Sequence, residues 1–136
     1  MDLEPRYSVT VSSIPYVSDD LLPDGTATFS ASAVAKGLGV SSSKVLQLVR
    51  DRQLIAVRRG GDFHIPQLFF GETDGRFAIA KHLTGLLQVL RDGGFQDDEI
   101  MQWLFAPLDD LDGAPAELLH TDSAREVIRR AQSMAF

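Results

Sequence analysis

One stretch of the chain decides the fold: SSSKVLQLVRDRQLIAVRRGGDFHIP, residues 41–66. It begins with serines and a helical spacing of apolar residues, and it continues with two short β-type runs around a Gly-Gly pair. Two glycines tolerate the positive φ angles of a tight turn, so the pattern predicts a helix followed by a β-hairpin. The stretch carries five Lys or Arg residues against two Asp, although the whole chain has a net charge of −6.

The predicted helix covers residues 42–51 and has two chemically different faces. Val45, Leu48 and Val49 fall at i, i+3 and i+4, which predicts one buried face. The opposite face is polar and basic. One of the leading serines caps the helix, because a serine hydroxyl accepts a hydrogen bond from an unpaired backbone N–H.

Flanking elements complete a helix–turn–helix–hairpin unit. A shorter helix is predicted over residues 31–36, with Ser30 as its cap and Gly37 at its end. The hairpin strands are predicted over residues 54–58 and 63–65. The sequence therefore predicts two helices and a wing in the order of a winged helix–turn–helix.

The rest of the chain predicts a tail, a loop and further helices. Residues 1–28 are rich in Ser, Thr and Pro, and we expect a mostly flexible N-terminal tail there. Residues 71–76, GETDGR, are expected to form a loop. Four helices are predicted after it, over residues 80–91, 97–105, 115–119 and 122–134.

These elements define the expected fold class and domains. The chain is expected to be mainly α with a small β-hairpin: a winged helix–turn–helix followed by a C-terminal helical extension. The tail covers residues 1–28, the winged DNA-binding unit residues 29–70, and the extension, packed on that unit, residues 71–136.

Positive charge is concentrated in the predicted winged unit. Residues 30–70 hold six Lys or Arg against two Asp, whereas residues 71–136 hold six against twelve acidic residues. Charges are screened over about 10 Å at moderate salt, so a basic face persists beside distant acids. Chance clustering of a few charges is the alternative that the count alone leaves open.

The unit matches what duplex DNA requires of a reading helix and a wing. Glutamine can pair with adenine through two hydrogen bonds, lysine favours guanine or phosphate, and a helix N-terminus favours phosphate. Arginines beside a Gly-Gly tip, which has no side chains, can reach a phosphate or the minor groove. Taken alone, the hairpin leaves one alternative open: its glycines form a turn and its arginines have no role in DNA binding. The predicted DNA-binding residues are Ser42, Ser43, Lys44, Gln47, Arg50, Arg58, Arg59 and Gly60.

Nothing in the residue pattern predicts a catalytic, metal or cofactor site. His64, His82 and His120 are scattered, without a second ligand at helical spacing. Asp110 and Asp112 resemble the start of a calcium loop, but a leucine stands at the closing glutamate position. We therefore expect a protein that is not an enzyme.

Composition gives an expectation about location. The chain has no cysteine, which excludes a disulfide framework, and no apolar run reaches the roughly 18 residues of a membrane span. Its N-terminus lacks the basic-then-apolar order of a signal peptide. We expect a soluble cytoplasmic protein that does not bind membranes.

The sequence VAKGLGVSSSKVLQLVRDRQLIAVRRGGDFHIP, residues 34–66, resembles the winged helix–turn–helix of the MerR/excisionase type. The chain is also similar to a family of small actinobacterial DNA-binding proteins that join this unit to a C-terminal helical extension. The resemblance implies double-stranded DNA as a partner, a role in transcriptional regulation, and a Ser/Thr protein kinase as a second partner. It extends over IPQLFF (65–70), GLLQVLRDGGFQDDEIMQWLF (85–105) and AREVIRRAQSMAF (124–136).

Two further hypotheses follow from segments outside the winged unit. Phosphorylation of a serine or threonine in the tail, with Thr10 as the first candidate, adds close to two negative charges and is expected to weaken DNA binding. Trp103-Leu104 and the segment LDGAPAELL, residues 111–119, resemble the toxin-binding domain of certain antitoxins. That resemblance gives the alternative function: an interaction protein whose acidic C-terminal helices bind a protein partner.

Overall fold

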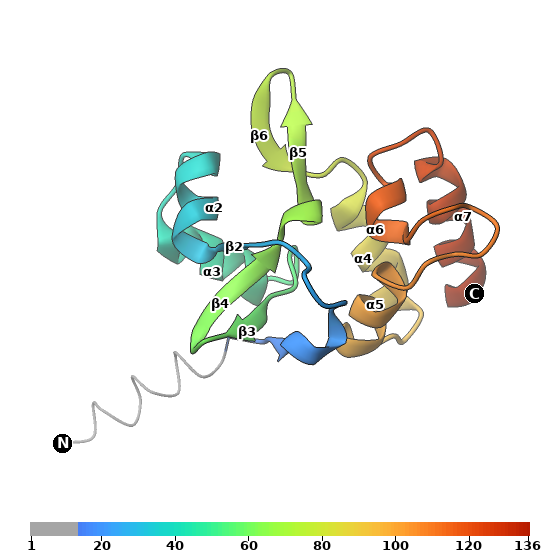
Figure 1. Ribbon diagram of the computed structural model, residues 1–136, viewed down its shortest axis with the longest axis horizontal. Coiled ribbons are helices and arrows are strands. Elements are labelled where there is room, and N and C mark those ends of the chain that lie inside the picture. Colours follow the sequence, from blue (N-terminus) through green and yellow to red (C-terminus); the bar gives the residue numbers. More distant parts are fainter. Residues whose placement is uncertain (1–13) are drawn as a thin grey trace.

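The computed structural model describes residues 14–136, and it places a small β-sheet between two groups of helices (Figure 1). Two helices of the winged unit lie on the left of this view, and the C-terminal helices lie on the right. Among the helices of residues 14–136, none is both long enough and apolar enough to cross a bilayer.

The helix–turn–helix forms where the serine caps predict it. Helix α2 covers Ala31–Leu38 and helix α3 covers Ser42–Arg50. The side chain of Ser30 accepts from the N–H of Ala33, and that of Ser41 accepts from the N–H of Lys44, each over 3.1 Å. Both hydroxyls satisfy a backbone donor that a helix start leaves unpaired.

The first helix ends two residues later than its glycine predicts. Gly37 lies inside α2, and Gly39, with φ of 73°, takes the left-handed conformation that ends the helix. Gly37 has a different role, because a Cβ atom built on it would lie 2.7 Å from the ring of Phe77. The glycine allows a β-hairpin from later in the chain to pack against the helix.

The predicted wing is confirmed as a hairpin of β3, Val57–Arg59, and β4, Asp62–Pro66. Gly60 and Gly61, with φ of 61° and 88°, form its turn. Leu54, Ile55 and Ala56 are buried but lie outside the strand. Strand β3 therefore begins at Val57, three residues later than predicted.

This hairpin forms the centre of a four-stranded sheet in the order β1-β3-β4-β2. Strand β2, Thr28–Ser30, runs antiparallel to β4, and strand β1, Val17–Ser18, runs parallel to β3. Ser30 ends β2 and caps α2, so the sheet fixes where the helix–turn–helix begins.

The flexible tail predicted to reach residue 28 is wrong for residues 14–28. Ile14, Val17 and Leu22 are buried in the core, and a 3-10 helix, η1 (Asp19–Leu21), follows β1. The polar composition of the segment does not predict this packing, because its three apolar residues are buried by contacts with residues that are distant in the sequence.

The loop predicted over residues 71–76 is also wrong. Strands β5, Phe70–Thr73, and β6, Arg76–Ile79, pair antiparallel around Asp74 and Gly75, which both have positive φ. An Asp-Gly pair favours such a turn. The rings of Phe70 and Phe77 stack with centroids 5.0 Å apart.

The C-terminal helices bury a leucine-rich core. A short 3-10 helix, η2 (Gln67–Phe69), leads from the wing towards them, and its Phe69 is fully buried. The buried side of the first of these helices carries leucines at helical spacing. The helices are α4 (Leu83–Asp92), α5 (Asp97–Leu104), α6 (Pro115–Leu118) and α7 (Ala124–Ala135).

An ion-pair cluster ties α7 to the loop before α6. The guanidinium of Arg130 pairs with the carboxylates of Asp110 and Glu126, and Arg129 also pairs with Glu126. Hydrogen bonds from Arg130 hold the pKa of Asp110 at about 2, and those from Arg129 and Arg130 hold the pKa of Glu126 at about 2. Both carboxylates therefore stay charged in mildly acidic solution.

Replacement of Gly37 by Ala tests the contact between α2 and the second hairpin. The new methyl group overlaps the ring of Phe77, which cannot swing away freely because it stacks on Phe70. We expect the free energy of unfolding to fall by about 1–3 kcal/mol in urea denaturation.

The matched control is Gly85→Ala, in α4. A Cβ atom there meets nothing within 4 Å, so only the helix propensity changes, and stability should rise by roughly 0.5–1 kcal/mol. Equal and stabilising effects of both substitutions would show that the ring does not restrict position 37.

Candidate nucleic-acid interface

Helix α3 presents a polar face to solvent. Ser43, Gln47 and Arg50 recur at i, i+4 and i+7, so they share one side of the helix, opposite the buried Val45 and Val49. The predicted contacts in this helix are all exposed: Ser42, Ser43, Lys44, Gln47 and Arg50.

The start of α3 adds unpaired donors to this face. The hydroxyl of Ser41 accepts from the N–H of Lys44, which leaves the N–H groups of Ser42 and Ser43 without a partner inside the helix. The positive end of the helix dipole lies there as well. Within residues 14–136, neither Lys44 nor Arg50 forms an ion pair. Both side chains are thus available to an anion.

Arg58 lies on the exposed face of the wing. Its guanidinium carbon is 5.4 Å from the ring centroid of Tyr16 and 5.6 Å from that of Phe63. The two rings meet edge to face at 5.9 Å. The aromatic pair supports the guanidinium plane while the side chain stays exposed. Gly60, at the tip, is exposed too.

Arg59 is engaged within the protein. Its Nε and Nη2 atoms donate to the carboxylate of Asp19, over 3.2 and 2.8 Å. Its Nη1 atom donates to the backbone oxygen of Thr26 and to the hydroxyl of Thr28. These bonds use four of the five N–H groups of the guanidinium, and a DNA contact by Arg59 stays a prediction.

The candidate interface includes a residue that was not predicted from the sequence. Tyr16 is 50% exposed and lies beneath Arg58, although it falls within the tail predicted from the sequence. The local sequence holds no strand alternation that could have identified it, because Ile14 and Val17 lie three residues apart.

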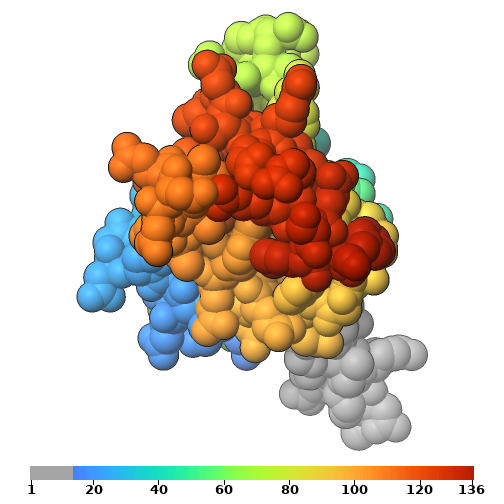
Figure 2. All heavy atoms as spheres, turned by 90° about the vertical axis from the view of Figure 1, so that its right-hand side faces the viewer, coloured from blue at the N-terminus to red at the C-terminus, as the bar shows by residue number. Residues whose placement is uncertain are grey.

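Helix α3 and the wing lie on the same side of the molecule. In Figure 1 both are on the left, and the C-terminal helices are on the right. Figure 2, seen from the right, shows α4–α7 in front, with α2 and α3 almost hidden behind them. Helices α6 and α7 therefore lie on the other side of the molecule from α2 and α3. In residues 14–136, no three His, Asp or Glu side chains come together in a way that could hold a metal ion.

A double-mutant cycle tests whether Arg59 supports the wing. Asp19→Asn, Arg59→Met and the double variant should give a coupling energy of about 0.5–1 kcal/mol in urea denaturation, because the pair is bidentate and only partly exposed. The control cycle uses Glu126 and Arg129, whose arginine is 63% exposed, and should give less. If the coupling energy between Asp19 and Arg59 is no larger than that of the control pair, Arg59 does not support the wing.

Comparisons with known proteins agree with this architecture. A family model described as the winged helix–turn–helix domain of DNA-binding protein Rv2175c matches residues 13–70, and one described as the Rv2175c C-terminal domain of unknown function matches residues 80–135. The first match begins at residue 13, so it includes the segment that packs beside the wing.

One curated relative and one solved structure extend the match over most of the chain. The DNA-binding protein Rv2175c of Mycobacterium tuberculosis (strain ATCC 25618 / H37Rv) is 45% identical over 138 residues, which cover 93% of this chain and 92% of that protein. The NMR structure of Rv2175c matches with a TM-score of 0.76 and 44% identity, over 91% of this chain and 90% of that one. The resemblance and the fold class inferred from the sequence are thereby confirmed. With a winged helix–turn–helix followed by a helical extension, this chain belongs to the Rv2175c family.

Proposed function

We propose that this chain binds double-stranded DNA with sequence preference and regulates transcription. The observation that carries the proposal is the exposed polar stripe of α3 beside Lys44, which forms no ion pair with any residue from 14 to 136. In a helix–turn–helix, the second helix enters the major groove with its N-terminal residues towards the base edges. The name of the curated relative, a DNA-binding protein, supports the same function.

The residues of α3 divide by chemistry into base contacts and phosphate contacts. Gln47 suits adenine, and Lys44 suits guanine or a phosphate. Ser42 and Ser43 offer hydroxyl and backbone N–H groups, the latter at a helix N-terminus that favours phosphate. Arg50, one turn further along the stripe, is proposed to contact the backbone. Phosphate contacts then give affinity, and base contacts give preference.

The wing is proposed to lie on the DNA backbone or in the minor groove. Arg58 supplies the charge, and Gly60 at the tip has no side chain to hold the hairpin away. Tyr16 supports Arg58 from below. Arg59 is proposed to fix the wing through Asp19 and, from that position, to add its predicted contact with the DNA.

The net negative charge of the chain is compatible with DNA binding because the acidic residues are unevenly distributed along it. The C-terminal part holds twice as many acidic as basic residues, and α6 and α7 lie on the other side of the molecule from α3. Its Asp97 is nearer, because it pairs with Arg52 just after α3. Screening limits its repulsion at the interface to short range. Within that range, the uneven distribution of charge favours the approach in which α3 faces the DNA.

This role requires no chemical step, so we propose no catalytic residue and no cofactor. A protein that regulates transcription works in the compartment that holds the chromosome. We therefore propose the cytoplasm as its location.

A protein partner at the C-terminal helices is the second candidate. Met134 and Phe136, at the end of α7, are 40% and 87% exposed, and they give such a partner an apolar contact. Two side chains form a small patch compared with the several hundred Å² of a protein interface. DNA binding therefore ranks first, and partner binding is proposed as an addition to it.

Regulation by a Ser/Thr protein kinase is proposed for the N-terminal tail. Thr10 lies outside the described residues, so its candidacy depends on the sequence. The described chain begins beside β1, which pairs with β3 of the wing. A phosphate added a few residues earlier would bring negative charge towards the surface that is proposed to bind phosphate groups.

Salt dependence tests the proposed interface. A duplex selected from a random pool at two salt concentrations serves as the ligand. For Lys44→Ala and for Arg58→Ala, the slope of log K against log salt should each flatten by about one, because each variant loses one phosphate contact. Fluorescence anisotropy titrations measure the slopes.

Arg125→Ala is the matched control. Arg125 is exposed on α7, on the other side of the molecule, so its removal should leave the slope unchanged. Equal slopes for all three variants and the original protein would refute the assignment of α3 and the wing.

Replacement of Thr10 by Glu tests the proposed modification site. The added charge should weaken DNA binding by roughly 1 kcal/mol or less, about fivefold in Kd, and the effect should diminish as salt rises. Thr10→Gln, of the same shape without the charge, is the control in the same titration. If the Glu variant keeps its affinity at low salt, Thr10 is not the controlling residue.

A further inference from the structure

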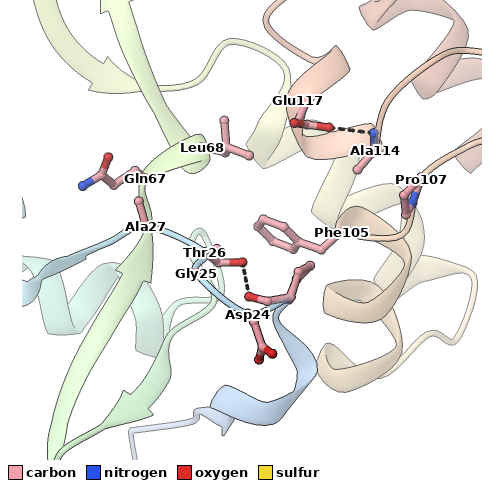
Figure 3. Close-up of a pocket in the computed structure, with 11 residues that line it drawn as sticks. Asp24, Gly25, Thr26, Ala27, Gln67, Leu68, Phe105, Pro107, Ala114 and Glu117 are labelled. Carbon is pink, nitrogen blue, oxygen red and sulfur yellow. Dashed lines mark hydrogen bonds between the residues drawn. The ribbon is translucent and has the colours of Figure 1, made fainter.

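A cleft of about 540 Å³ lies between the N-terminal segment and the C-terminal helices. Figure 3 shows its wall: Thr26 and Ala27 on one side, Leu68 of η2 above, and Phe105 and Ala114 across the opening. The cleft is thus built by both parts of the fold, and it is separate from the exposed face of α3.

The size and lining of the cleft suit a small organic molecule. Ligand sites of about 300–1,000 Å³ with mostly apolar walls and a few polar groups are typical of such ligands, and they often lie where two domains meet. Here the walls are mainly apolar, and the ring of Phe105, which is otherwise buried, forms part of the floor.

The charges at the cleft indicate the class of ligand. Asp24 and Glu117 line it, and no Lys or Arg is among the described residues that do so. One oxygen of Glu117 accepts from the N–H of Ala114 over 3.0 Å, which fixes the carboxylate at the rim. Its other oxygen forms no hydrogen bond within residues 14–136.

We propose that this cleft binds a small amphipathic cation: an apolar body of drug-like size that carries an ammonium or similar N–H donor. The apolar body lies against Phe105 and Leu68, and the cationic group meets the carboxylate of Glu117. An anionic analogue of the same shape is repelled by the carboxylate of Glu117.

A hydrogen bond connects the cleft to the wing. The backbone oxygen of Thr26, a residue of the cleft wall, accepts from Nη1 of Arg59 over 3.4 Å. Arg59 directly precedes the Gly60–Gly61 turn. A ligand that displaces the segment around Thr26 therefore changes the support of the wing. The proposal that a ligand binds here depends only on the cleft. The proposal that the ligand changes DNA affinity depends also on the proposed function.

Tryptamine and indole-3-propionate provide a matched pair of probes with one ring system and opposite charges. In ¹H–¹⁵N correlation spectra of the full chain without DNA, tryptamine should shift the amide signals of Thr26, Ala27 and Phe105. It should also shift those of Gly60 and Gly61, through Arg59. The anionic probe should bind at least about tenfold more weakly.

Two variants test the site. Ala27→Trp fills the cleft from an exposed position and should weaken tryptamine binding at least about tenfold. Glu117→Gln keeps an acceptor for the N–H of Ala114 but removes the charge, so tryptamine should bind about threefold more weakly. Circular dichroism confirms that each variant is folded.

The outcomes separate the claims. Binding to neither probe at millimolar concentration, equal binding to both, or shifts that persist in Ala27→Trp overturn the cation site. Shifts at the cleft without shifts at Gly60 and Gly61 overturn its connection to the wing. These readouts need no DNA, so they stand whether or not the salt-dependence experiment supports the proposed function. A change in duplex affinity on adding tryptamine, absent in Ala27→Trp, would support both.

Discussion

The β3–β4 hairpin is the constraint on which the other elements depend. Its two strands are the inner strands of the sheet, so β1 and β2 are each held by one of them. Through β2 the hairpin fixes the cap of α2, and through β1 it fixes the segment that carries Tyr16 and Asp19. Beyond Pro66 the chain passes straight into η2 and the buried Phe69. A tight two-glycine turn thus sets the position of both the proposed interface and the core behind it.

Local chemistry made part of this structure predictable from the sequence. Ser30 and Ser41 each cap a helix through a hydroxyl and a backbone N–H three residues on, and such signals need no distant partner. The Gly60–Gly61 turn and the apolar side of α3 are equally local. For the same reason, the exposed residues of α3 could be named in advance.

The features that could not be predicted depend on contacts between distant residues. Residues 14–28 look like a tail until Val17 pairs with Val57. Arg59 looks like a free cation until Asp19 approaches from 40 residues earlier in the chain. The β5–β6 hairpin was predicted as a loop because its sequence is polar. Its Asp-Gly turn is part of a hairpin that packs on α2 through the contact of Phe77 with Gly37. In each case a partner that is remote in the sequence decides the role of the residue.

The outer strands of the sheet have a consequence for the behaviour of the protein in solution. Strands β1 and β2 contain two and three residues, and they are the edges of the sheet. A short edge offers few free N–H and C=O groups to a strand from another molecule. Copies of the protein that gather at neighbouring positions on one nucleic acid thus have little opportunity to join through the edges of this four-stranded sheet.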